Sequence, residues 1–379
     1  MNYIERKECS IIHNQDLEPL YDFIDFPVFM GCTQQPPEKD IKADMRWVIS
    51  KRSGLIQLRS LLPLEVLYPE AHGAGCVGAL WLKHHRALAE FIKNCSSHSV
   101  FEIGGSHGIL EKEFSGLNGR IPWTVIEPNP VPVDGCNATF IKGFFDDRFK
   151  YSGSFDTVVH SHVFEHVYEP DTFVKHLSGF MPEGTKMIFS IPNMQAMLER
   201  KYTNCINFEH TTFLTDTYAD FLLLKHGFNI SKKKFFLDDH SIFYCAIKDH
   251  TVKAANLPVG LYEKNKKMYM EYLDYHKKLI YEINEKINNS SNPIYLFGAH
   301  VFAQYLIAFG LKTDRIVSIL DNDTNKHSKR LYGTKLLVNS PQILKTIDSP
   351  VVILKAGVYN EEIKNDILTN INSHVEFWE

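Results

Sequence analysis

The chain has 379 residues, of which 44% are hydrophobic, and its 41 basic and 45 acidic residues give a net charge of −4. This composition excludes a mainly disordered protein and a broad positive surface for nucleic acid, and the length favours two or three domains. No apolar run reaches the roughly 18 residues of a membrane span, and residues 1–8 lack the apolar core of a signal peptide. We therefore expect a cytoplasmic protein with no membrane or nucleic-acid partner.

The cysteines do not form a recognisable framework. Their number is odd and no two of them make a C-x-x-C pair, which argues against structural disulfides and against a zinc knuckle built from local pairs. We expect them to be small, partly buried apolar residues. The seven are Cys9, Cys32, Cys76, Cys95, Cys136, Cys205 and Cys245.

Residues 1–85 combine short apolar runs with turn residues, which predicts a small, irregular N-terminal domain with some strands. Residues 81–93 then show the spacing of an amphipathic helix. From residue 86 to 250, short apolar runs alternate with helix-like stretches, which predicts βαβ units and a parallel sheet in an α/β fold. The expected strands are 100–104, 123–127, 155–160 and 186–191, followed by an antiparallel hairpin at 235–237 and 241–247.

The last third of the chain predicts a second sheet. Residues 258–290, rich in Tyr, Lys, Glu and Asn, predict a long polar helix within a linker at 251–290. Three apolar runs follow, at 293–299, 315–321 and 350–355, and they predict a smaller Rossmann-like domain over 291–379. The sequence does not predict an oligomeric state.

A glycine-rich turn at residues 104–108 is the strongest chemical signal. Gly104, Gly105 and Gly108 follow an apolar strand, and glycines let the backbone turn tightly and approach a ligand. Their spacing differs from the G-x-G-x-x-G of a dinucleotide phosphate loop, which disfavours a nicotinamide-dependent oxidoreductase. The acid Glu102 inside the strand favours a cationic ligand over an anion. Glu127, at the end of the next strand, is placed to accept hydrogen bonds from a ribose diol.

The pattern E-x-G-x-x-x-G over residues 102–108 resembles motif I of Rossmann-like S-adenosylmethionine methyltransferases. The alternative is a doubly wound domain that uses its glycines only for turns. The resemblance implies that S-adenosylmethionine is the cofactor, with its methionine end at the glycine turn and its ribose at Glu127. It also implies that Asp146, in Gly-Phe-Phe-Asp, lies at the adenine and that His162 lines the floor near the methyl group.

Without that resemblance, His162, Glu165 and His166 suggest a metal triad. A Glu-His pair that enters a helix is otherwise a helix cap or a core contact, and we expect no metal here.

A second chemical signal is the pair Glu209-His210, which lies in the loop after the fifth predicted strand and before a helix at 216–226. Such a loop faces the ligand crevice of an open α/β sheet. Histidine is suited to moving a proton near neutral pH, and an adjacent acid would orient or tune it. The plain alternative is a loop histidine that caps the following helix.

This loop resembles that of the three-domain C-methyltransferases that act on nucleotide-linked 4-keto-deoxysugars. Residues 54–73 and 294–322 are similar to other parts of the same family. The resemblance implies that His210 is a general base beside Glu209, and that Tyr68 reaches the same cleft. The base would form an enolate that attacks the sulfonium methyl, and Tyr68 could donate to the enolate oxygen. The spacing of His72 suggests it as a second donor, and the alternative is a histidine in a turn.

The chain departs from that family at its zinc site. The family holds zinc with two C-x-x-C pairs, whereas residues 9–12 read Cys-Ser-Ile-Ile and residues 50–53 read Ser-Lys-Arg-Ser. Serine and isoleucine cannot replace thiolates at a tetrahedral zinc, so we predict no metal in this degenerate domain. The loss leaves two alternatives to C-methylation: a sugar or glycan O-methyltransferase, and a non-catalytic nucleotide-binding scaffold.

Overall fold

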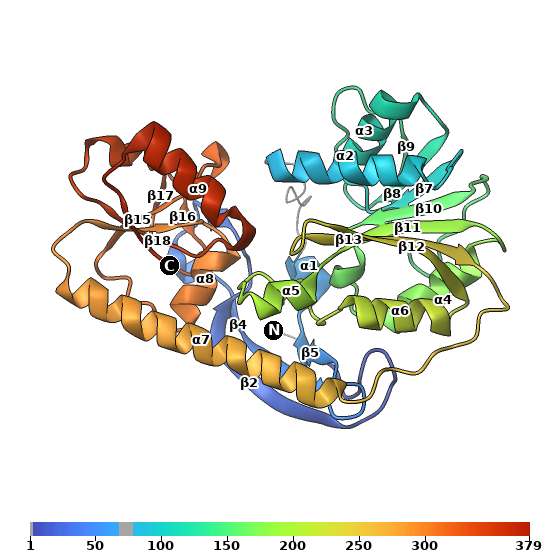
Figure 1. Ribbon diagram of the computed structural model, residues 1–379, viewed down its shortest axis with the longest axis horizontal. Coiled ribbons are helices and arrows are strands. Elements are labelled where there is room, and N and C mark those ends of the chain that lie inside the picture. Colours follow the sequence, from blue (N-terminus) through green and yellow to red (C-terminus); the bar gives the residue numbers. More distant parts are fainter. Residues whose placement is uncertain (1–2, 68–78) are drawn as a thin grey trace. The chain divides into compact units, whose positions relative to one another are not determined.

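The computed structural model describes residues 3–67 and 79–379, and the chain divides into two compact units (Figure 1). The first unit comprises Met1–Asp16, Leu61–Gln195 and Glu209–Leu261, and the second comprises Leu17–Ser60, Ala196–Phe208 and Tyr262–Glu379. The four predicted segments divide the chain differently, since most of the predicted N-terminal domain is grouped here with the C-terminal residues.

The first unit contains a seven-stranded sheet with the order β12-β13-β11-β10-β7-β8-β9. Strands β7 to β11 are parallel, and β13 pairs antiparallel with both β11 and β12. This is the predicted Rossmann-like α/β sheet. Its strands are β7 (Val100–Ile103), β8 (Trp123–Glu127), β9 (Thr139–Lys142), β10 (Thr157–Ser161), β11 (Lys186–Pro192), β12 (Phe228–Phe236) and β13 (Ser241–Lys248).

Helices cover both faces of this sheet. In Figure 1, α2 (Ala79–Lys93) and α3 (Ile109–Asn118) lie on one face, and α4 (Pro170–Phe180) and α6 (Asp216–Lys225) lie on the other. Strands covered on both sides are mostly apolar, which is why β7, β10 and β11 appear in the sequence as short, largely apolar runs. The strand order reverses direction at β7, so the crevice at the carboxyl ends of β7 and β10 is the expected ligand site.

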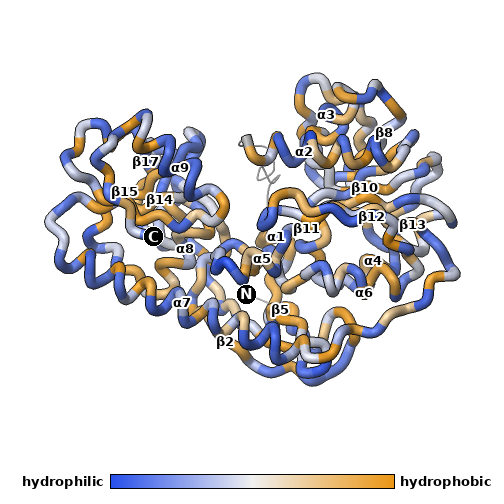
Figure 2. Tube along the Cα trace, in the orientation of Figure 1, coloured by the Kyte–Doolittle hydropathy of each residue, from blue (hydrophilic) through white to orange (hydrophobic). Residues whose placement is uncertain are grey.

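The second unit contains a parallel five-stranded sheet with the order β17-β15-β14-β18-β19. The long helix α7 (Leu261–Asn289) is predicted as a polar spacer, but one of its faces is buried in the core of this sheet through Leu279, Ile280, Ile283 and Ile287. Figure 2 shows its polar and apolar positions alternating along the tube. The strands are β14 (Ile294–Phe297), β15 (Ile316–Leu320), β17 (Val338–Asn339), β18 (Val351–Leu354) and β19 (Glu376–Trp378), and the shorter helices are α8 (Val301–Ala308) and α9 (Asn360–Asp366).

A three-stranded antiparallel sheet of β2 (Leu17–Pro27), β4 (Lys42–Ser50) and β5 (Ile56–Leu58) also belongs to the second unit. The turn after β4 holds the serines that replace the second cysteine pair. Ser50 Oγ accepts the N–H of Ser53, and Ser53 Oγ accepts the N–H of Leu55, each at 3.2 Å. Hydroxyl groups therefore hold this turn. The absence of zinc stays a prediction.

The remaining elements are short. Among the described residues, no helix combines the length and apolar character needed to cross a membrane. The short elements are β1 (Ile4–Glu5), β3 (Cys32–Thr33), β6 (Ser60–Leu61), β16 (Arg330–Leu331), α1 (Leu64–Leu67) and α5 (Met194–Glu199).

Candidate active site

The glycine turn follows β7 directly, and the backbone conformation or the surroundings of each glycine disfavour a larger residue. Gly104 and Gly108 have φ angles of +73° and +67°, a region that side chains disfavour. A Cβ on Gly104 would lie 2.7 Å from Cγ2 of Val163, and one on Gly105 would lie 2.7 Å from Cδ of Glu102. The turn is therefore packed against the loop that follows β10 on one side and against the buried Glu102 on the other.

Replacing Gly108 with alanine is expected to lower the free energy of unfolding by about 2–5 kcal/mol, because left-handed strain of about 1–2 kcal/mol adds to overpacking of about 1–3 kcal/mol. The new Cβ would overlap Sγ of Cys136. Gly116→Ala in α3 is the matched control, since no described atom lies within 4 Å of that Cβ, and it is expected to stabilise by about 0.5–1 kcal/mol. Urea unfolding measures both, and equal effects would contradict this account of the turn.

Glu102 lies beneath the turn and is only 2% exposed. Its Oε2 accepts a 2.7 Å hydrogen bond from Nε1 of Trp123. Burial raises the pKa of Glu102 to about 7; the Trp123 bond opposes this, and the charges of Glu111 and Glu127 add to it. A cation bound at the turn would favour the ionised form of this carboxyl group.

Glu127 ties the glycine turn to the loop after β8. Its Oε2 accepts the N–H of Ser106 and its Oε1 accepts the N–H of Asn129, both at 3.1 Å. A carboxylate oxygen accepts two hydrogen bonds, so each oxygen keeps one acceptor position beyond these backbone bonds. The structure thus places the predicted ribose acid at the turn.

Asp146 lies beyond the end of β9 and forms an ion pair with Arg148. Its Oδ2 accepts bonds from Nη2 at 2.6 Å and from Nε at 3.1 Å, and this pairing lowers the pKa of Asp146. Two residues earlier, Phe144 is 64% exposed, whereas Phe145 contacts Phe173 and Phe180 in an aromatic cluster. Phe144 is the aromatic ring of this segment that is open to a flat ligand.

His162 follows β10 with a left-handed φ of +51° and bonds on both sides of its ring. Its Nδ1 lies 2.8 Å from Oε1 of Glu165, and its Nε2 lies 2.8 Å from Oγ of Ser241. The adjacent Val163 is the residue that contacts Gly104. The predicted methyl-floor residue is therefore held rigidly beside the glycine turn.

Glu165 is fully buried and joins His162 to the predicted base. Its Oε2 makes no hydrogen bond to any residue that the structure describes, and a carboxylate oxygen of Glu165 and one ring nitrogen each of His166 and His210 lie within 4.8 Å of one another. Burial by itself would raise the pKa of Glu165, but the three histidines outweigh it and lower the pKa to about 2. A buried negative charge therefore faces the histidine pair.

His210 lies against His166, with ring centroids 4.8 Å apart and nearly perpendicular planes. Oε2 of Glu209 lies 3.9 Å from Nδ1 of His166. The pair predicted from adjacency is thus part of a group of two acids and two histidines. Such a group can orient an imidazole and stabilise its protonated form.

The buried guanidinium of Arg6 anchors the loop that carries His210. Its Nη1 donates to the carbonyl oxygen of Thr211 at 3.0 Å, and its Nη2 donates to Oγ1 of Thr211 and to the carbonyl oxygen of Tyr168. Thr211 immediately follows His210 and is fully buried. The backbone at His210 is therefore fixed from the N-terminal segment.

The structure brings most of the predicted site residues to the carboxyl ends of β7, β8 and β10. Asp146 lies after β9 with its own partner, and Tyr68 and His72 lie outside the described residues. Sequence reasoning missed the central place of Glu165 and the contributions of His84, His240 and Ser241. The run from His162 to His166 was the available signal, because it placed an acid between two histidines.

The chain is similar to known methyltransferases over the segment that carries most of this site. Residues 80–233 match the family model of a methyltransferase domain, and no curated protein matches the chain. Among solved structures, an O-methyltransferase family protein from Burkholderia thailandensis is similar at 10% identity and a TM-score of 0.36, covering 47% of this chain and 57% of that one. Human N-acetylserotonin methyltransferase in complex with S-adenosylmethionine is similar at 15% identity and a TM-score of 0.39, covering 50% and 60%.

Magnesium protoporphyrin IX methyltransferase from Synechocystis, with bound S-adenosylhomocysteine, is similar at 15% identity and a TM-score of 0.33, covering 45% of this chain and 85% of that one. This chain spans less than two thirds of the first two relatives, and all three scores are too low to bear on substrate. The family model covers the glycine turn, Glu127, His162 and His210. The similarity to a methyltransferase domain therefore extends over most of the described site residues.

Proposed function

We propose that this protein is an S-adenosylmethionine-dependent methyltransferase in which His210 acts as the general base. The observation that carries the proposal is the group around His210, where the buried, ionised Glu165 and the ring of His166 lie beside it in a methyltransferase domain. A negative charge held near an imidazole stabilises the imidazolium formed when it takes a proton.

The glycine turn and its neighbours would hold the cofactor. The ribose diol would donate hydrogen bonds to the acceptor positions left on Glu127, and the exposed ring of Phe144 would stack on the adenine. The cationic methionine end would lie at the turn above Glu102, whose carboxyl group favours positive charge. Asp146 would lie near the adenine and would at the same time remain in its ion pair with Arg148.

The acceptor that we propose is a nucleotide-linked 4-keto-deoxysugar, methylated at the carbon next to the ketone. His210 would remove the proton from that carbon and leave an enolate. The cofactor, when bound, would supply its sulfonium methyl group to the enolate carbon and would itself become the neutral thioether S-adenosylhomocysteine. Support for this acceptor comes from the resemblance of the Glu209-His210 loop, with Tyr68 proposed to reach the same cleft.

A sugar hydroxyl is the second candidate acceptor. The serines that hold the turn at residues 50–55 in place of thiolates mark a divergence from the keto-sugar family and favour it. In that case His210 would deprotonate an alcohol, and no carbon acid would be formed.

Proton exchange separates the two acceptors. With S-adenosylhomocysteine bound in ²H₂O, the protein is expected to replace the proton next to the ketone of a nucleotide-linked 4-keto-deoxysugar, and His210→Gln is expected to abolish this exchange. With ¹³C-methyl cofactor, the carbon spectrum then distinguishes a carbon-bound from an oxygen-bound methyl. An oxygen-bound product without exchange would replace the first acceptor with the second. Binding of S-adenosylhomocysteine without turnover of any sugar would instead support a scaffold.

A further inference from the structure

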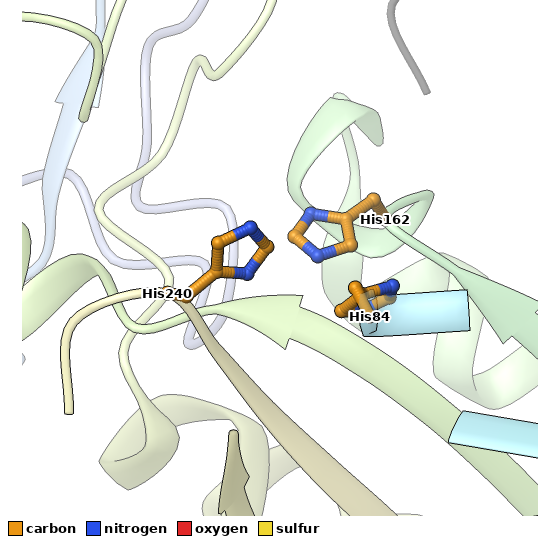
Figure 3. Close-up of side chains that lie close together, drawn as sticks. All are labelled: His84, His162 and His240. Carbon is orange, nitrogen blue, oxygen red and sulfur yellow. The ribbon is translucent and has the colours of Figure 1, made fainter. Parts of the chain in front are cut away.

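Three histidines from separate parts of the first unit converge at the carboxyl edge of its sheet (Figure 3). His84 comes from α2, His162 follows β10, and His240 lies in the turn between β12 and β13. One ring nitrogen of each lies within 4.8 Å of the others, and the ring centroids are 5.1 to 6.1 Å apart. The role proposed for the group around His210 does not require this second cluster.

His84 is the unusual member because it is fully buried and unsatisfied. Neither Nδ1 nor Nε2 makes a hydrogen bond within the described part of the chain. Apart from the neighbouring histidine rings, its ring contacts Trp81, Phe236 and Phe243, which offer no acceptor at those positions. Buried polar atoms in native proteins nearly always have a partner, so this ring indicates a missing ligand.

Hydrogen bonds to the other two histidines fix their tautomers so that Nε2 of each ring carries a lone pair. Oε1 of Glu165 lies 2.8 Å from Nδ1 of His162 and accepts its N–H, which leaves Nε2 of that ring as an acceptor. The single hydroxyl proton of Ser241 therefore goes to His162 Nε2, and Ser241 Oγ accepts from Nδ1–H of His240 at 2.6 Å. The lone pair of His240 then lies on Nε2. A carboxylate behind a histidine is the usual support of a metal-binding imidazole.

We propose that His84, His162 and His240 bind one transition-metal ion, with Zn²⁺ as the best match. Neutral imidazoles suit zinc, copper and nickel, whereas Mg²⁺ and Ca²⁺ prefer oxygen ligands that this trio lacks. The ion would take the Nε2 lone pair of His162 in place of the Ser241 hydroxyl. Three protein ligands leave a fourth position of tetrahedral zinc open to water or to a substrate oxygen.

The site is independent of the proposed sugar chemistry, yet it lies close to the cofactor turn, because Val163 next to His162 contacts Gly104. It also revises the expectation that the chain binds no metal. That expectation was based on the lost cysteines and on the interpretation of the Glu165-His166 pair as a helix cap or core contact, and neither considers the trio described here.

The test uses the full-length protein after chelator treatment. Zn²⁺ is expected to bind at one ion per chain by calorimetry and to raise the melting temperature, and Co²⁺ is expected to give visible absorption bands of a nitrogen-liganded ion. His84→Phe and His240→Gln are expected to weaken Zn²⁺ binding at least about 10²-fold. His84→Phe places an apolar ring in an apolar surrounding, so it is expected to fold as well as the wild type in the presence of chelator.

Two control variants locate the ion. His98→Gln changes an exposed histidine and is expected to bind Zn²⁺ like the wild type, and so is His210→Gln, which removes the proposed base from the neighbouring cluster. The proposal is wrong if the wild type binds no Zn²⁺, or if His84→Phe keeps the ion while His210→Gln loses it. Because S-adenosylhomocysteine binding is measured on the same variants, a failure of the metal site is distinguishable from a failure of the methyltransferase assignment.

Discussion

Replacing His210 with glutamine is expected to lower kcat by about 10²–10⁴-fold, the contribution typical of a positioned general base. Glutamine is similar in size and keeps a polar side chain, but it cannot take a proton. The buried acid Glu165 and the ring of His166 stay in place, so the loop held by Arg6 is expected to keep its conformation. The affinity for S-adenosylhomocysteine is therefore expected to change little.

Steady-state kinetics on the acceptor and calorimetry with S-adenosylhomocysteine measure the two quantities. His98→Gln, at an exposed position, is the control for a histidine change without a role in the site. A variant at His210 that keeps near-normal kcat but shows a raised KM would make this residue a binding group. Unchanged kinetics would remove it from the mechanism.

The sequence predicted the strands that are buried on both faces and missed those that are not. β7, β10 and β11 lie inside the sheet and are largely apolar, so their positions could be predicted to within about two residues. β9 forms the edge of the sheet, both of its terminal residues are exposed, and it was not predicted. β12, at the other edge, begins at Phe228, although only residues 235–237 were expected, because most residues before them, including the lysines at 232–234, are exposed or half-buried and polar.

The parts of the site that follow recognisable strands could be predicted, whereas contacts between loops that are distant in the chain could not. Gly104, Gly108 and Glu127 follow strands that could be recognised, so their meeting at one edge follows from parallel pairing. Adjacency suggested that Glu209 serves His210, and the structure adds a second acid near His210, the buried Glu165, far away in the chain. Contacts of this kind arise from the packing of separate loops, and no local pattern encodes them.

The place of His84 in a cluster could not be predicted from the sequence either. In the sequence it belongs to an amphipathic helix and has no distinguishing neighbour. Only the fold brings it to His162 and His240, with its nitrogens unsatisfied. The chemistry of the carboxyl edge therefore depends on three elements whose proximity is a property of the sheet.

Replacing Glu102 with glutamine is expected to stabilise the protein above pH 7 and to have little effect near pH 4.5. The folded pKa of about 7 lies above the ordinary value of 4.5, so between these values the unfolded chain has lost a proton that the folded protein keeps. The wild type therefore loses stability as the pH rises through this window, and the loss is complete above pH 7. A difference of 2.5 pKa units corresponds to about 3 kcal/mol, as an upper limit. Glutamine does not titrate and still offers an oxygen to the N–H of Trp123.

Urea unfolding of both proteins from pH 5 to pH 8 measures the effect, provided that no cofactor is present, since a bound cation would favour the ionised carboxyl group and reduce the difference. Glu90→Gln, which changes an exposed glutamate on α2, is the matched control and is expected to shift stability by no more than about 0.5 kcal/mol at any pH. A stability difference for Glu102→Gln that does not grow with pH would mean that this carboxyl group is already ionised at pH 5. The glycine turn would then cover a permanent negative charge, and the cofactor's positive charge would have a stronger reason to bind there.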